Sequence, residues 1–245
     1  MHRSTTYHST SYFDKDLSLI DQNSSLRDRY EILNQWRELT KPAETYYSTR
    51  SVPEEQQVLL DLREFIESKD PAKFIECMKS IDSLGAASLN AVKLFLIFDF
   101  NVNTEYENRF ILSYAFEVED IFDKLKDLLY GFGADVNICD ENDNSILQKA
   151  ASCGHENAVT WLLSKGADAN NRDIFGSSVM WSAFMSEDID IAKILVEHGA
   201  KDSKLYNAVK RLPEDHIHAS IKRKALEFLE SLDDTVKERF GVHQN

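Results

Sequence analysis

A repeat of 33 residues constrains this chain more than any other feature of its sequence. Gly-Ala-Asp-Val-Asn at residues 133–137 recurs as Gly-Ala-Asp-Ala-Asn at 166–170, and Gly-Ala returns alone at 199–200. The same interval separates Asp140 from Asp173. A unit of this size cannot bury its apolar face alone and must pack against its neighbours. The sequence therefore predicts a stacked array of similar units.

Each unit is predicted to contain two short helices. In the best-preserved unit, apolar residues follow helical spacing over 145–152 and again over 156–164. Gly154 separates these helices, and Gly166 stands where a glycine in the left-handed conformation commonly ends a helix. The chain has only 8 Gly and 4 Pro, which is sparse for a turn-rich all-β protein. The predicted fold class is all-α.

The sequence of residues 140–172 resembles the ankyrin-repeat family. The resemblance is clear over 140–202 and extends more weakly over 55–211. Residues 145–148 and 178–181 stand where the family has Thr-Pro-Leu-His, and these departures predict less stable repeats. The resemblance implies an ankyrin-repeat solenoid with capping helices at its N-terminal and C-terminal ends.

Domain boundaries are predicted from where the repeat pattern weakens. The predicted segments are a disordered or loosely packed tail at 1–24, an N-terminal helical cap at 25–54, repeats at 55–211 that are degenerate before 105, and a C-terminal capping helix at 212–245. An apolar stripe with helical spacing runs from about 215 to 240. Such a helix is expected to cover the exposed end of the array. The alternative is that it docks a partner.

Charge and cysteine content indicate which class of partner the protein binds and in which cellular compartment it works. The net charge is −14, and because residues 1–50 are neutral, the acidic excess lies in 51–245. An acidic body repels phosphate backbones and anionic membranes, so the expected partner is a protein and not a nucleic acid. Three cysteines without framework spacing indicate reduced thiols, and no apolar run reaches the ~20 residues of a membrane span. We expect a cytoplasmic monomer without membrane insertion.

No group of residues has the spacing of a catalytic, metal or cofactor site. Cys139, Cys153 and His155 do not form the closely paired ligands of a zinc site. Gly-Phe-Gly at 131–133 follows a predicted helix and not a strand, so it is no nucleotide-binding loop. The sequence therefore predicts a protein that is not an enzyme and has no cofactor. The alternative is an unrecognised catalytic site in residues 1–100.

The family resemblance also implies where a partner binds, namely the loop tips and the concave row of first helices. The positions that correspond to the family's recognition residues are Glu141, Asn142, Asn144, Ser152 and Cys153 in one repeat, Ile174, Phe175, Ser177 and Met185 in the next, and Tyr106, Glu107, Arg109 and Glu117 in the degenerate unit. Ile174 and Phe175 are the strongest candidates, because large side chains at a loop tip make good interface anchors. The alternative is that Phe175 folds back onto the neighbouring loop. Trp181 is expected to pack inside the stack.

These observations leave three functional hypotheses. The first is a protein-interaction module that acts as an adaptor or inhibitor. The second is a special case of the first, since degenerate repeats with unusual flanking helices resemble effectors that intracellular bacteria deliver into the host cytosol. The acidic and apolar C-terminus, which ends near Phe240, also resembles a type IV secretion tail. The third is the enzyme with a catalytic part in 1–100.

Overall fold

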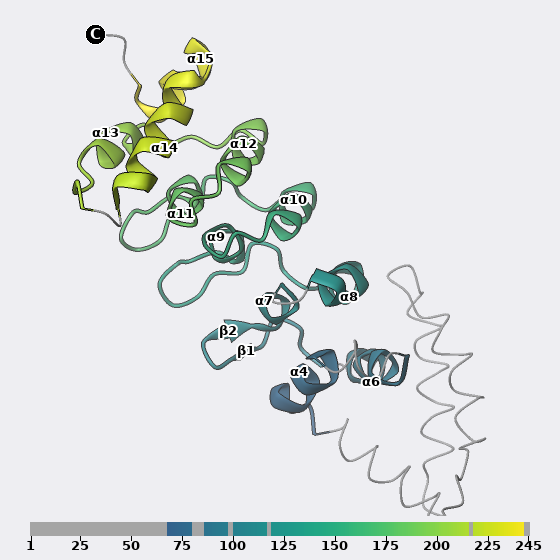
Figure 1. The fold of residues 1–245 in the computed structure, drawn as a ribbon. Coiled ribbons are helices and arrows are strands. Elements are labelled where there is room, and N and C mark those ends of the chain that lie inside the picture. The colour runs from purple at the N-terminus through teal and green to yellow at the C-terminus, as the bar shows by residue number, and fades with distance from the viewer. Residues whose placement is uncertain (1–67, 80–85, 98–99, 117–118, 216–217, 243–245) are drawn as a thin grey trace, which may run out of the picture. The chain divides into compact units, whose positions relative to one another are not determined.

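A computed structural model describes residues 68–79, 86–97, 100–116, 119–215 and 218–242 (Figure 1). The chain divides into two compact units, one ending at Ala134 and the other beginning at Asp135. The described residues are mostly helical, in agreement with the predicted fold class, and their only strands form one short hairpin. The predicted tail at 1–24 and cap at 25–54 lie outside the described residues.

Unit 1 consists of helix pairs and a hairpin. Its elements are α4 (Pro71–Lys79), α6 (Ala86–Ile97), β1 (Glu105–Tyr106), β2 (Arg109–Phe110), α7 (Ile111–Ala115) and α8 (Glu119–Gly131). Helix α4 packs against α6 and α7, and α7 packs against α8. Phe74 of α4 stacks on Phe100 with ring centroids 4.3 Å apart, and Phe95 of α6 meets the Phe74 ring edge-on at 5.5 Å. These buried rings form the core between α4 and α6.

Unit 2 contains the two clearest repeats and the C-terminal helices. Its elements are α9 (Ile146–Ser152), α10 (Glu156–Ser164), α11 (Val179–Met185), α12 (Ile189–Glu197), α13 (Leu205–Lys210), α14 (His218–Ser231), α15 (Asp234–Lys237) and the 3-10 helix η1 (Glu238–Phe240). Helix α9 packs against α10 and α11, and α10 packs against α12. Figure 1 shows α9 and α11 in one row and α10 and α12 in a second. This confirms the predicted two-helix unit.

The first helix of each repeat begins at a serine. Ser145 caps α9 by accepting a hydrogen bond from the Gln148 backbone, and the Gln148 side chain accepts one from the Ser145 backbone. The Ser178 hydroxyl caps α11 by accepting from the Trp181 backbone. Gly166 follows α10 with φ +91°, a conformation in which a glycine avoids the steric cost of a side chain. The predicted starts and stops are thereby explained by local hydrogen bonds and backbone geometry.

The recurring Gly-Ala-Asp-x-Asn motif links one repeat to the next. The Asn137 side chain accepts from the Asp168 backbone (2.8 Å) and donates to the Gly166 carbonyl (3.3 Å). One repeat later, the Asn170 side chain accepts from the Lys201 backbone (2.9 Å). The asparagine therefore satisfies backbone groups of the following repeat, which gives the motif a structural role.

The single helix predicted from about 215 to 240 is wrong in its length. Helix α14 ends at Ser231, and Asp233 is in an extended conformation (φ −64°, ψ 150°) directly before α15. Helix α14 packs against α11, α12 and α13 and buries its apolar residues Ile221, Ala225 and Leu229. These three residues of the predicted stripe are thus covered by unit 2.

Candidate functional site

The loop before α11 presents two large apolar side chains to solvent. One carboxylate oxygen of Asp173 accepts hydrogen bonds from the backbone of Phe175 (3.0 Å) and Ser177 (2.7 Å). This tight turn leaves the Ile174 side chain 56% exposed and the Phe175 side chain 82% exposed. Phe175 therefore does not fold back onto the neighbouring loop, which was the alternative left open by the sequence.

The loop before α9 has the same construction. One carboxylate oxygen of Asp140 accepts from the backbone of Asn142 and of Asn144, both at 2.9 Å. The Ile174 backbone donates to the Asn142 carbonyl at 3.0 Å, which joins the tips of the two loops. Glu141 is exposed at its tip. The structure thus brings together the predicted loop-tip residues of the two consecutive repeats.

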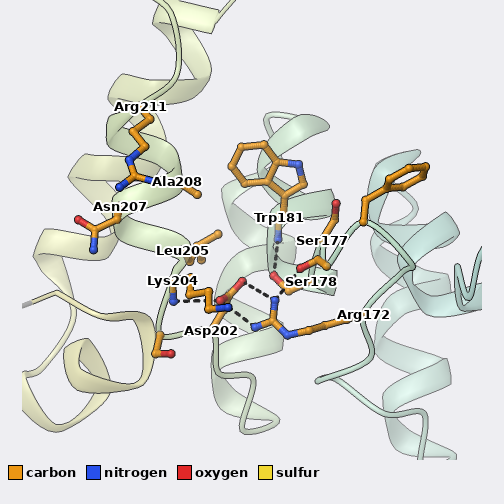
Figure 2. A pocket seen from close by; sticks show the side chains of 13 residues that line it. Arg172, Ser177, Ser178, Trp181, Asp202, Lys204, Leu205, Asn207, Ala208 and Arg211 are labelled. Atoms are coloured by element: carbon orange, nitrogen blue, oxygen red, sulfur yellow. Dashed lines mark hydrogen bonds and ion pairs between the residues drawn. The ribbon is translucent and has the colours of Figure 1, made fainter.

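A groove of about 460 Å³ lies beside Phe175, and we call it the α11–α13 groove. It is lined by residues 172 and 175–178 of the loop, by Trp181 of α11, and by residues 202–205, 207, 208 and 211 (Figure 2). Figure 2 shows Trp181 on one side of the groove, with Asn207 of α13 and Arg211, which follows α13, on the other. The Trp181 side chain is only half-buried. The prediction that it packs inside the stack is therefore correct only in part.

Arg172 and Asp202 form the floor of this groove. The Arg172 guanidinium donates to both carboxylate oxygens of Asp202, at 2.8 and 3.3 Å, and to the Gly176 carbonyl at 2.7 Å. Asp202 is only 5% exposed, and it also accepts from the Lys204 backbone (3.1 Å). The pair holds the loop before α11 against the segment before α13. A buried carboxylate needs such a partner, because its charge is costly away from water.

The sequence contained a signal for Asp202 that the motif search missed. Positions 136, 169 and 202 are separated by the repeat interval and hold Val, Ala and Asp. All three are buried in the structure. A carboxylate at a position that is apolar in the preceding repeats predicts a buried ion pair. Arg172 is its partner.

Three other predicted binding residues of unit 2 differ in their exposure and in their position relative to the groove. Ser177 and Met185 are half-buried, and Ser177 lines the α11–α13 groove. The Ser152 hydroxyl is exposed and donates to the Lys149 carbonyl at 2.9 Å. Ser152 and Met185 do not line the groove.

Three of the four candidates in unit 1, Tyr106, Glu107 and Arg109, lie on the hairpin before α7. The fourth, Glu117, lies outside the described residues. Glu107 and Asn108 form the turn of the hairpin, with φ +50° and +59°. The Arg109 guanidinium lies over the Tyr114 ring, 4.2 Å from its centroid. The charge of Glu107, followed by smaller effects of burial and of Asp70, raises the pKa of the Tyr106 hydroxyl. These residues form a separate cluster and do not line the α11–α13 groove.

The described thiols and carboxylates do not gather into an ion-binding group. No three His, Cys, Asp or Glu side chains in the part of the chain that the structure describes could hold a metal ion together. Burial, and then the nearby charge of Glu76, raise the pKa of the Cys77 thiol to about 11. Burial and the acidic side chains of Asp143, Asp140 and Asp135 raise the pKa of Cys139. None of the described helices has the length and hydrophobicity of a membrane-spanning segment.

Comparison with known proteins identifies the repeats. A family model described as ankyrin repeats in three copies matches residues 83–173 and 112–207. The chain is 35% identical over 68 residues to an ankyrin and IPT/TIG repeat-containing protein of Schizosaccharomyces pombe, a match that covers 28% of this chain. It is 34% identical over 106 residues, or 42% of this chain, to serine/threonine-protein kinase 12 of Arabidopsis thaliana. The matches span only 6% and 22% of these relatives' own lengths.

Proposed function

This chain belongs to the ankyrin-repeat family, and from that membership we propose that it acts as an adaptor or inhibitor. Ankyrin repeats indicate a protein–protein interaction module. In our proposal the partner protein binds to the loop tips and to the face formed by the first helices of unit 2. The observation that carries the proposal is the exposure of Phe175 and Ile174 beside the α11–α13 groove.

The chemistry of the loop tips supports this assignment. An exposed aromatic side chain next to a concave surface can bury a large apolar area against a partner. The Asp173 and Asp140 turns, together with the hydrogen bond from Ile174 to Asn142, hold the backbone of both tips. A preorganised loop loses less conformational entropy on binding than a mobile one. Phe175 and Ile174 are therefore suited to anchor a protein partner.

Two other hypotheses come from the sequence, namely an effector, which is a special case of the binding module, and an enzyme with its catalytic site in residues 1–100. Delivery into a host cell by an intracellular bacterium is motivated by the degenerate repeats, but the two relatives come from a yeast and a plant and lend it no support. Phe240 of the suggested secretion tail is fully buried. A catalytic site in residues 1–100 would fall mostly outside the described residues. Our proposal is a monomeric, non-catalytic binding module.

The experiment that tests the proposal is affinity capture from eukaryotic cytosol. The intact protein is compared with the double variant Ile174→Ala/Phe175→Ala, and the circular dichroism of both is recorded. The matched control is Tyr130→Ala, which removes another exposed aromatic side chain, but from unit 1. We expect one partner to be lost with the double variant and retained with the control. Partners that persist with a folded double variant would overturn the assignment of this surface.

A further inference from the structure

The α11–α13 groove is bordered by a basic segment of an acidic protein. Residues 201–211 contain four Lys or Arg and a single Asp, whereas the whole chain carries a net charge of −14. The single acid, Asp202, is buried and paired with Arg172. The groove therefore presents positive charge to a ligand, although the surrounding protein is negative.

The groove also presents hydrogen-bond donors that the described part of the chain does not use. The side chains of Lys204 and Arg211 line it and form no hydrogen bond or ion pair with any residue that the structure describes. The same holds for the Asn207 amide and the Trp181 indole N–H. Figure 2 shows Trp181 on one side of the groove and Asn207 and Arg211 on the other. Such a set of donors matches a ligand that is rich in acceptors, such as carboxylates and backbone carbonyls.

We propose that the α11–α13 groove binds an acidic peptide segment that carries an apolar side chain. This inference rests on the proposed function and names the chemistry of its partner. Carboxylates of the segment pair with Lys204 and Arg211, and its apolar side chain packs against the rings of Phe175 and Trp181. Arg211 provides a planar fork that can hold a carboxylate by two hydrogen bonds.

The charge distribution favours a peptide over a nucleic acid. A polynucleotide carries a negative charge every few ångströms along its length and would meet the acidic body on leaving the groove. A peptide needs only a few carboxylates to pair with Lys204 and Arg211. Its apolar side chains can also bury surface against the exposed Phe175 ring, which stabilises the complex. The Arg172–Asp202 pair does not oppose such a ligand, because the Asp202 charge is already neutralised by Arg172.

The test is fluorescence anisotropy with the full chain and three short labelled peptides. The first alternates Glu and Leu, the second alternates Lys and Leu, and the third alternates Glu and Gly. We expect the Glu–Leu peptide to bind best, and we expect its affinity to fall as salt is raised, since exposed charges are screened. Equal binding of the Lys–Leu peptide would overturn the acidic preference, and equal binding of the Glu–Gly peptide would overturn the apolar contact.

A matched pair of variants separates the groove from bulk charge. Lys204→Glu/Arg211→Glu reverses the two groove cations, and Lys201→Glu/Lys210→Glu makes the same change of net charge at neighbouring positions that do not line the groove. All four side chains are exposed, so both variants are expected to fold. The groove variant should bind the Glu–Leu peptide on the order of a hundredfold more weakly, and the control within about threefold of the parent. If both variants lose the same affinity for the Glu–Leu peptide, the effect comes from net charge alone and the inference is overturned.

Two further measurements complete the test. If a labelled oligothymidylate competes as well as the Glu–Leu peptide, the groove is a general polyanion site and the inference falls. The capture experiment with Ile174→Ala/Phe175→Ala separates this failure from that of the proposed function. Loss of the captured partner without any preference for the acidic peptide would leave the proposed function standing and refute only the partner chemistry.

Discussion

Arg172 and Asp202 form a two-pronged ion pair that joins the loop before α11 to the segment before α13. The Asp202 backbone donates to the Arg239 carbonyl at 2.8 Å, so the same residue also contacts the C-terminal segment. The carboxylate of Asp202 thus bonds one side of the groove, and its backbone N–H bonds the C-terminal segment. A change at this residue should affect both stability and the shape of the groove.

Asp202→Ala is expected to lower the free energy of unfolding by about 1–3 kcal/mol, as measured by urea denaturation. The variant removes the acceptor of the Lys204 backbone N–H and leaves the Arg172 guanidinium with only its bond to the Gly176 carbonyl among the described residues. Because Arg172 is partly exposed, water can replace some of the lost bonds, and the cost stays below that of breaking a fully buried ion pair.

The control for Asp202 is Asp234→Ala. Asp234 is an exposed carboxylate whose ion pair with Lys237 is long, at 3.6 Å. Its removal should change the unfolding free energy by less than about 0.5 kcal/mol. If both variants have the same effect, the Arg172–Asp202 pair does not have the structural role that its geometry indicates.

The sequence predicted the repeats well because their period is set by backbone requirements. Gly166 occupies a left-handed position, and Asn137 and Asn170 bond backbone groups of the following repeat. Because each unit requires a glycine and an asparagine at the same places, these residues recur in the sequence every 33 residues. Helices α9 and α10 accordingly lie within about one residue of their predicted ranges.

The groove could not be predicted from motifs, because it is formed by residues that depart from the repeat pattern. Asp202 replaces an apolar residue, and Trp181 replaces the family's histidine. The break between α14 and α15 was missed for a different reason. The apolar spacing continues across Asp233 to Val236, so periodicity alone does not show that the helix has ended.

Gln148→Ala tests whether a departure from the family motif has a stabilising role. The Gln148 side chain is 1% exposed, donates to the Ser177 carbonyl (3.0 Å) and accepts from the Asn171 amide (2.7 Å). Its loss removes the capping box of α9 together with bonds to the next repeat. We expect a loss of about 1–3 kcal/mol in urea denaturation.

The control for Gln148 is Ser152→Ala at the other end of α9. Its hydroxyl is exposed, donates to the Lys149 carbonyl of the same helix and has a long contact of 4.0 Å with the neighbouring Cys153 Sγ, so it makes no bond to another repeat among the described residues. A change within about 0.5 kcal/mol is expected there. A Gln148→Ala variant as stable as this control would contradict a role in linking the repeats.

Gly241→Ala should destabilise the protein more than Gly199→Ala. Both glycines have positive φ, at +72° and +80°, so each substitution carries a backbone cost of roughly 1 kcal/mol. A Cβ at Gly241 would also lie 2.0 Å from the Ser203 carbonyl oxygen, whereas a Cβ at Gly199 would meet nothing within 4 Å. Thermal denaturation of the two variants measures the difference. Equal melting temperatures would show that the Gly241–Ser203 approach is not needed for folding.

Thiol alkylation by iodoacetamide should proceed faster at Cys153 than at Cys77. Cys153 is exposed, whereas burial raises the pKa of Cys77 to about 11, and only the thiolate is reactive. Because the thiolate fraction rises about tenfold per pH unit below the pKa, the Cys77 rate should keep rising from about pH 8 towards pH 11, provided the fold persists. Mass spectrometry of peptides from the native protein measures both rates. Samples unfolded in urea are the control, and there the two rates should converge. Comparable native rates at about pH 8 would show that Cys77 is not shielded by the packing of α4.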